Sequence, residues 1–243
     1  MATDSDYADR FLNAAEAMKA SLEKKYGRKF SGLGQARNHA LENNNPIIRN
    51  HQESLKILVD LRNVMQHSHV LSGVKLATPR LDAVNAMEEI AEKVQNPPKI
   101  HDYMIKDPAV LAPTDSLADA AELVIKEGFS QIPIYDEGKY QALFTTNALA
   151  RWLSDAVHRE QGHLIEEAVT VSAVLQFGED YDQPKFVKPG ESANKVCDFL
   201  SSESLRSTVL VTVDGTSTGK LQGIVTRFDV PQILRKITTA FPA

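Results

Sequence analysis

The sequence predicts an α+β protein in which an N-terminal four-helix α bundle is followed by two tandem β-α-β-β-α repeats. Two observations predict this fold class. Residues 1–98 have apolar residues at helical spacing and no strand-like alternation, whereas the rest of the chain repeats one order of helix and strand patterns. The prolines at 97 and 98 separate the two parts, because they end a helix and form a stiff linker. We therefore expect one domain at residues 1–98 and a second at 99–243.

Four segments of the N-terminal part carry an apolar stripe at helical spacing. The expected helices are residues 6–25, 33–43, 46–70 and 78–95. Pro46 follows two asparagines and is expected to open the long third helix, since proline is preferred at the first helical position.

The C-terminal part contains an internal repeat, with one copy at about residues 100–157 and the other at about 170–237. In each copy a helical pattern is followed by two apolar runs typical of strands and then by a second amphipathic helix. The paired strands are expected at residues 132–135 and 141–145 in the first copy and at 208–213 and 221–226 in the second.

Residues 223–229, with the sequence Gly-Ile-Val-Thr-Arg-Phe-Asp, place a hydroxyl and a carboxylate where a buried strand leads into a helix. The N–H groups of a helix N-terminus suit a phosphate, and Asp229 in the first turn can accept hydrogen bonds from the vicinal hydroxyls of a ribose. A nucleotide offers both groups. An ordinary N-cap threonine with a carboxylate that compensates the helix dipole explains the same residues without a ligand, but the repeat favours a binding site.

The repeats resemble a pair of CBS domains, a module that senses adenosine-containing ligands. The resemblance depends on residues 129–136 in the first copy and 223–229 in the second. It implies a cleft shared by the two repeats, with adenine against apolar backbone, ribose on Asp229 and phosphate near Thr226. No cofactor is required, and the expected ligand is AMP, ADP, ATP or S-adenosylmethionine. The ligand-binding residues that the resemblance implies are Gly223, Thr226, Arg227 and Asp229 with Met104, Pro108, Ala109, Ser130, Gln131 and Ile132.

The first copy departs from this pattern, because Ala142 replaces the glycine and Ala148 falls where the aspartate should be. No carboxylate is expected there. Asn147 lies one residue early and so points about 100° round the helix from the family position. We therefore expect one competent site and a second, degenerate site at Thr145, Thr146 and Asn147. The acidic residues at 179–182 are interpreted as a charge cluster in a loop.

Arg62, Asn63 and His67 lie near the end of the third expected helix, where Asn63 and His67 are one turn apart on one face. They offer a cation for phosphate, an amide, and an imidazole for acid–base chemistry. The motif and its surroundings at about residues 6–98 resemble HEPN domains, many of which are metal-independent ribonucleases that act as dimers. The resemblance implies proton transfer by His67 and stabilisation of the phosphorane by Arg62. A structural or dimerising bundle, in which Arg62 and His67 make interface hydrogen bonds, is the alternative explanation of the motif.

Composition excludes several other classes of function. The net charge of −5 argues against a strongly basic nucleic-acid binder, so no DNA partner is expected. An RNA partner is possible only because the HEPN resemblance implies it. No apolar stretch approaches the roughly 18 residues that span a bilayer, and the N-terminus has no signal-type apolar core, so no membrane association is expected. The single cysteine, Cys197, is expected to be a buried thiol of a cytoplasmic protein. No metal site is expected, because neither cysteine nor carboxylate lies at ligand spacing near the histidines.

Three hypotheses follow for the whole chain. The first is a non-catalytic CBS-pair regulator that senses an adenine nucleotide and passes its ligand state to the helical domain. The second is a nucleotide-gated, metal-independent ribonuclease, and the third is a structural homodimer with vacant clefts. Both resemblances imply a homodimer, and its candidate contacts are Leu149, Trp152 and Leu153 with Val230, Ile233 and Leu234.

Overall fold

The computed structural model describes residues 4–67, 77–159, 169–202 and 206–238, and it is a mixed α+β structure. The chain divides into two compact units, one of residues 1–98 with 234–243 and the other of residues 99–233. Residues 234–243 fall with the helical unit in this division, whereas the sequence predicts them in the second domain. Within the described ranges, no helix is both long enough and apolar enough to cross a membrane.

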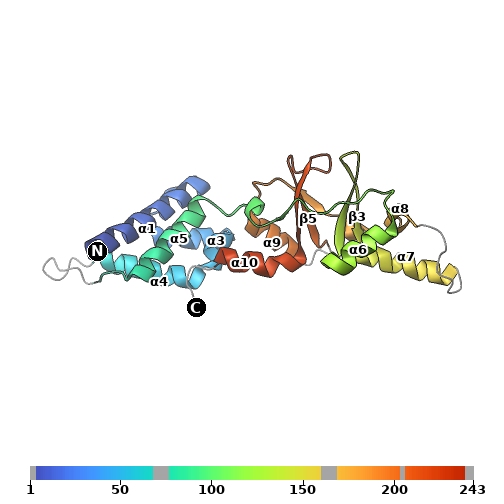
Figure 1. Ribbon diagram of the computed structural model, residues 1–243. Coiled ribbons are helices and arrows are strands. Elements are labelled where there is room, and N and C mark those ends of the chain that lie inside the picture. Colours follow the sequence, from blue (N-terminus) through green and yellow to red (C-terminus); the bar gives the residue numbers. More distant parts are fainter. Residues whose placement is uncertain (1–3, 68–76, 160–168, 203–205, 239–243) are drawn as a thin grey trace. The chain divides into compact units, whose positions relative to one another are not determined.

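The first unit is helical. Its helices are α1 (Asp4–Tyr26), α2 (Leu33–Glu42), α3 (Pro46–Asn50), α4 (Gln52–His67) and α5 (Leu81–Gln95), which Figure 1 shows in blue to green. Helices α1 and α5 pack along each other, and all five contribute to one apolar core. The largest fully buried side chains of this core are Phe11, Met18, Leu22, Leu33, Ile48, Leu55, Met87 and Ile90.

The predicted third helix is wrong as a single element, because the chain breaks at His51 into α3 and α4. The break follows from the backbone of His51, whose φ of −112° and ψ of 19° depart from helical values. The Asn45 side chain starts α3 by accepting hydrogen bonds from the N–H groups of Ile47 and Ile48. Apolar spacing stays helical across His51, so the pattern did not reveal the break. The predicted end of this helix at residue 70 lies outside the described residues.

The last helix of the unit begins at Leu81, three residues later than predicted. Thr78 precedes Pro79, and a residue before proline is disfavoured in helical conformation. Arg80 is extended, with φ −71° and ψ 155°, and forms the N-cap. The helical part of the chain therefore has five helices among the described residues instead of the predicted four.

The second unit contains both repeats. The first runs β1 (Ile105–Lys106), α6 (Leu117–Glu127), β2 (Gln131–Asp136), β3 (Lys139–Thr145) and α7 (Thr146–Arg159). The second runs β4 (Lys185–Val187), α9 (Ala193–Ser201), β5 (Thr208–Thr212), β6 (Leu221–Thr226) and α10 (Val230–Thr238), and α10 belongs to the second unit only up to Ile233. The short helix α8 (Val171–Leu175) lies between the repeats, and the 3-10 turns η1 (Ile100–Asp102), η2 (Asp180–Asp182) and η3 (Arg227–Asp229) complete the unit.

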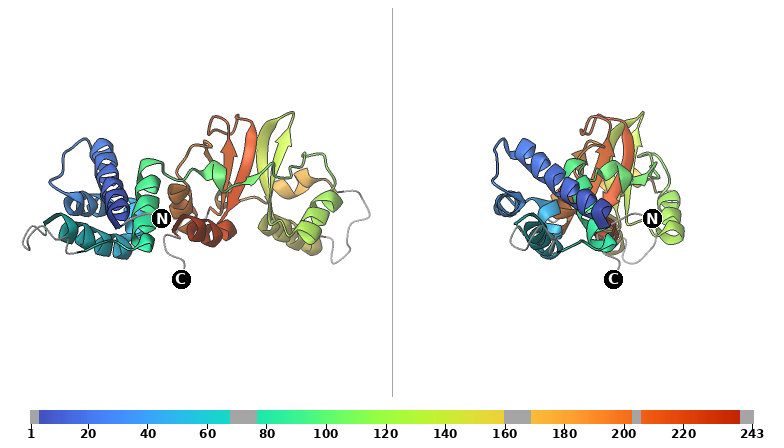
Figure 2. Two further views of the ribbon diagram at one scale, coloured as in Figure 1. Left: turned by 60° about the vertical axis from the view of Figure 1, so that its left-hand side comes forward. Right: turned by 90° about the vertical axis from the view of Figure 1, so that its left-hand side faces the viewer.

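One strand of the first repeat, β1, joins the sheet of the second repeat. One sheet has the order β1-β6-β5-β4, and the other is the antiparallel pair β2-β3 (Figure 2). Strand β1 of the first repeat pairs antiparallel with β6 of the second, with Ile105 opposite Ile224 and Lys106 opposite Gly223. The chain after β1 continues beside the start of β6, where the Asp107 N–H donates to the Gln222 carbonyl at 3.3 Å, whereas Thr226 lies at the other end of β6.

Candidate functional site

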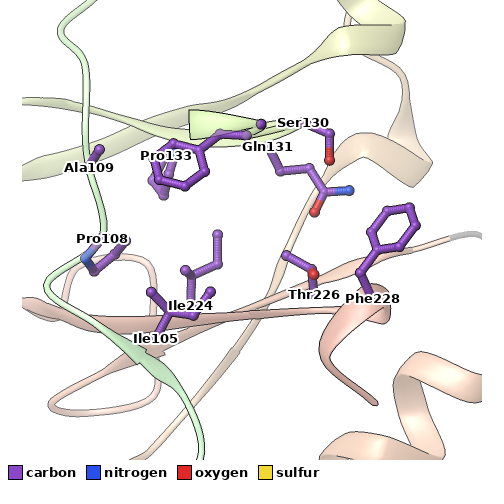
Figure 3. A pocket seen from close by; sticks show the side chains of 11 residues that line it. Ile105, Pro108, Ala109, Ser130, Gln131, Pro133, Ile224, Thr226 and Phe228 are labelled. Atoms are coloured by element: carbon purple, nitrogen blue, oxygen red, sulfur yellow. The ribbon is translucent and has the colours of Figure 1, made fainter. Parts of the chain in front are cut away.

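A pocket of about 390 Å³ lies where β1 and β6 of the four-stranded sheet meet β2 of the hairpin sheet (Figure 3). This volume is within the range of small-molecule sites, about 300–1,000 Å³. Both repeats contribute to it. The lining residues are Ile105, Pro108, Ala109, Gly128, Phe129, Ser130, Gln131, Pro133, Ile224, Thr226 and Phe228.

The lining divides into an apolar half and a polar half. Ile105, Pro108 and Ala109 lie at one end, and Ser130, Thr226 and Phe228 lie toward the other (Figure 3). The Phe228 side chain is 82% exposed at the rim of the polar half. None of the described side chains that line the pocket carries a charge. A ligand with a flat apolar part and a hydroxyl-bearing part matches this division.

Thr226 joins the pocket to Asp229. The backbone N–H of Thr226 donates to Asp229 Oδ2 at 2.7 Å, and Thr226 Oγ1 donates to the same oxygen at 2.9 Å. These bonds form because Thr226 precedes η3 as its N-cap and Asp229 occupies the third position of the turn. Asp229 itself is not among the lining residues but is hydrogen-bonded to Thr226, which is. Its Oδ1 has no hydrogen bond within the described part of the chain, so it can accept a ligand hydroxyl.

Gln131, at the start of β2, places an amide in the polar half. Its Nε2 donates to Ser207 Oγ at 2.8 Å, which holds the side chain across from the second repeat. The Oε1 atom is buried and has no hydrogen-bond partner among the residues described. An unpaired buried acceptor is uncommon in folded proteins, because it loses its bonds to water.

The structure places five of the ten implied ligand-binding residues in the pocket lining, namely Pro108, Ala109, Ser130, Gln131 and Thr226. Besides Asp229, four residues lie elsewhere. Arg227 turns away, because its Nε donates to the Leu200 carbonyl at 2.8 Å and its Nη2 to the Arg206 carbonyl at 3.3 Å. Ile132 points into the core of the first repeat.

Gly223 and Met104 serve the packing of β1 on β6. A Cβ at residue 223 would lie 2.7 Å from Met104 Cγ and 2.8 Å from the Ile105 carbonyl oxygen. Real Cβ atoms do not approach other heavy atoms so closely. The glycine is therefore needed where the strand of one repeat meets the strand of the other.

Six lining residues were not among the residues implied by the sequence: Ile105, Gly128, Phe129, Pro133, Ile224 and Phe228. Strand alternation could have found two of them, since alternate side chains of a strand share a face. Pro133 lies two residues after Gln131 on β2, and Ile224 lies two residues before Thr226 on β6.

The corresponding position of the first repeat is filled by the chain itself. Thr145 Oγ1 donates to Asp182 Oδ1 at 3.1 Å, and Arg151 forms an ion pair with Asp182 Oδ2. Asp182 is only 7% exposed and also accepts a hydrogen bond from the Glu179 N–H at 3.0 Å. The prediction that no carboxylate is available here is therefore wrong, and so is the interpretation of this residue as part of a loop charge cluster.

Arg151 is held on several sides. Its Nε donates to the Phe177 carbonyl at 2.7 Å, and its Nη1 donates to the Tyr181 hydroxyl at 3.0 Å. Ala148 is 1% exposed in the core of the first repeat, which explains why no aspartate stands there. Thr146 is half-buried and Asn147 is exposed, at the start of α7.

In the helical unit, Arg62 has a partner that the sequence did not indicate. Its Nη2 donates to Glu16 Oε1 at 2.8 Å, and its Nη1 to Asn63 Oδ1 at 3.3 Å. The hydrogen bond from Arg62 lowers the pKa of the Glu16 carboxyl. His67 is the last residue of α4, and its side chain lies outside the described residues. The ribonuclease hypothesis therefore stays a prediction from the sequence.

Neither a metal site nor a reactive thiol is found in the described parts of the chain. No group of three or more histidine, cysteine, aspartate or glutamate side chains there could hold a metal ion. Cys197 on α9 is buried, and burial raises the pKa of its thiol to about 11. A protonated, buried thiol is a poor nucleophile.

Comparison with known proteins identifies the module to which this site belongs. The family model of the CBS domain matches residues 100–155, which lie in the first repeat. A segment of 70 residues of this chain is 34% identical to inosine-5′-monophosphate dehydrogenase of Pasteurella multocida. The segment covers 29% of this chain and 14% of that enzyme. An uncharacterized protein of Methanocaldococcus jannaschii, MJ1225, is 24% identical over 159 residues, which cover 65% of this chain and 53% of that protein.

The chain thus spans about half or less of the length of these two curated relatives. Among solved structures, the complex of CBSX2 from Arabidopsis thaliana with AMP is 20% identical. The structural alignment covers 57% of this chain and 97% of CBSX2, with a TM-score of 0.43.

Proposed function

We propose that the protein is a regulatory CBS-pair protein that binds one adenosine-containing ligand and passes its ligand state to the N-terminal helical domain. The observation that carries the proposal is the pocket of about 390 Å³ that both repeats line, with Thr226 and its Asp229 partner at the polar end. The CBS match at residues 100–155 supports it, because it covers the repeat that supplies most of the lining.

The lining suits a nucleoside. The base lies against the apolar half, between Ile105 and Ile224 on one sheet and Pro133 on the other. The ribose hydroxyls donate to Asp229, whose Oδ2 is already fixed by Thr226. Such charge-assisted hydrogen bonds are the strong ones. Because the ligand touches both repeats, binding changes the contacts between them, which is the requirement for a sensor.

One ligand per chain is expected. The site of the first repeat is occupied by the Asp182 carboxylate, which Thr145 and Arg151 hold. A second nucleoside would have to break a buried ion pair before it could bind, and breaking such a pair is costly.

The proposed assembly is a homodimer. Of the apolar candidates, Leu149 and Trp152 pack against the core of the first repeat. Leu153 on α7 is 42% exposed and therefore available to a second copy. Light scattering at micromolar concentration tests the assembly, and a monomer in the wild-type protein would contradict it.

Isothermal titration calorimetry of the full chain with AMP tests the binding site. Replacing Asp229 by alanine is expected to weaken binding about ten- to a hundredfold, because charge-assisted hydrogen bonds contribute about 1.5–3 kcal/mol each. Asp229→Asn is the control, since its amide oxygen still caps Thr226 but carries no charge. It should fold as stably as the wild type and bind with intermediate affinity. Unchanged affinity in a folded Asp229→Ala variant would refute the assignment.

A further inference from the structure

The polar half of the pocket offers mainly acceptors, and the Ser130 hydroxyl there can donate or accept. Gln131 uses its Nε2 on Ser207, and its unpaired Oε1 points toward Thr226 in Figure 3. Thr226 has one hydroxyl proton, which it donates to Asp229. The hydroxyl can therefore only accept from a ligand. An ionised Asp229 also only accepts.

At the polar half, the backbone N–H groups of Thr226 and Arg227 and the Arg227 guanidinium, which could bind a phosphate, already donate to other groups. The N–H of Thr226 donates to Asp229, and the N–H of Arg227 donates to the Ser207 carbonyl at 2.9 Å. The Arg227 guanidinium donates to the carbonyls of Leu200 and Arg206. Phosphate oxygens only accept hydrogen bonds near neutral pH and are bound by cations and N–H donors. The uncharged, acceptor-rich lining described above has the opposite chemistry.

Hydroxyl groups fit this lining, because each has a proton to donate. A ribose presents such hydroxyls next to a flat base, and the apolar half of the pocket is adjacent. Gln131 offers the clearest acceptor for such a hydroxyl, since its Oε1 is buried without a described hydrogen-bond partner and the side chain is held in place by Ser207.

We propose that this pocket recognises the nucleoside part of its ligand and does not recognise phosphate, and that Gln131 Oε1 selects a ribose hydroxyl. The inference rests on the proposed adenosine site and specifies its ligand class. That class is adenosine and 5′-substituted adenosines, with 5′-phosphates adding little affinity.

Isothermal titration calorimetry of the full-length wild-type protein tests the ligand class without any substitution. The probes are adenosine, AMP, ATP, 2′-deoxyadenosine and 3′-deoxyadenosine, each at low and high salt. The dissociation constants of adenosine, AMP and ATP are expected to lie within about threefold of one another and to depend little on salt. The reason is that the phosphates make no specific contact with the pocket. At least one deoxynucleoside should bind about tenfold more weakly, because it leaves the Gln131 acceptor buried and unpaired.

A matched pair of variants tests the role of Gln131. Gln131→Leu removes the acceptor, whereas Gln141→Leu makes the same change at an exposed position of β3 outside the pocket lining. For the deoxynucleoside that lacks the hydroxyl bound by Gln131, the penalty should disappear in Gln131→Leu and persist in Gln141→Leu. A penalty for a hydroxyl bound by Asp229 should persist in both variants. Thermal unfolding of both variants checks that each is folded.

The outcomes separate this inference from the proposed function. If ATP or AMP binds at least about tenfold more tightly than adenosine, and salt weakens that binding, the phosphate-independent ligand class is overturned while the adenosine site stands. If neither deoxynucleoside is penalised, or if Gln131→Leu leaves the penalties of both deoxynucleosides unchanged, the role of Gln131 is overturned. If none of the five compounds binds, the proposed function itself fails.

Discussion

Replacing Asp182 by alanine should destabilise the first repeat by about 3 kcal/mol. Removing one partner of a buried ion pair costs about 3–5 kcal/mol, because the other charge is left without compensation. The lower end applies here, since the Arg151 side chain is 27% exposed and keeps its bonds to Phe177 and Tyr181. The Thr145 hydroxyl also loses its acceptor.

Trp152 provides the assay. It is the only tryptophan of the chain, and it packs against the core of the first repeat. Urea unfolding followed by its fluorescence therefore reports on this region. With a denaturant dependence of about 2 kcal/mol/M, a loss of 3 kcal/mol lowers the midpoint by about 1.5 M.

Asp180 provides the control, because it lies in the same turn but is exposed. Asp180→Ala should change the free energy of unfolding by no more than about 0.5 kcal/mol. A double-mutant cycle with Arg151→Ala should give a coupling energy above about 1 kcal/mol. An Asp182→Ala variant as stable as Asp180→Ala, or a coupling energy near zero, would refute the stabilising role of the Asp182–Arg151 ion pair.

Three further outcomes are expected. Gly223→Ala should destabilise the protein by about 2 kcal/mol or more, because the added Cβ would collide with the Ile105 carbonyl and overpack the contact. Equal urea midpoints for the variant and the wild type would contradict this. Burial raises the pKa of Cys197 above its unfolded value, so the folded state holds the proton more strongly and stability falls as the pH rises from about 9 to 11. This alkaline loss should be smaller in Cys197→Ala than in the wild type. Leu153→Lys should lower the dimer fraction in light scattering, whereas Lys139→Glu, an exposed change on β3, should leave it unaltered.

Local features of this chain were predictable because they depend on neighbours in sequence. Helical spacing located α1, α2 and most of α5, and apolar runs located β2, β3, β5 and β6. The contact of Thr226 with Asp229 is local too, since the two residues are three apart and meet in one turn. The implied ligand residues on β6 and at the start of β2 therefore fall near the pocket. The break at His51 could not be predicted, because the apolar spacing is the same on both sides of it.

What the sequence determined by itself is the repeat, its elements and the cap that joins Thr226 to Asp229. Tertiary structure alone decided three features: the pairing of β1 with β6, the unpaired Oε1 of Gln131, and the placement of Asp182 beside Thr145. Each depends on groups far apart in the chain, such as Gln131 and Ser207 or Thr145 and Asp182. Whether a buried polar atom finds a partner depends on how distant segments pack, and residue spacing carries no information about that packing. The missing aspartate at Ala148 shows the consequence, because a carboxylate absent from the motif was supplied from 34 residues further along the chain (182 − 148).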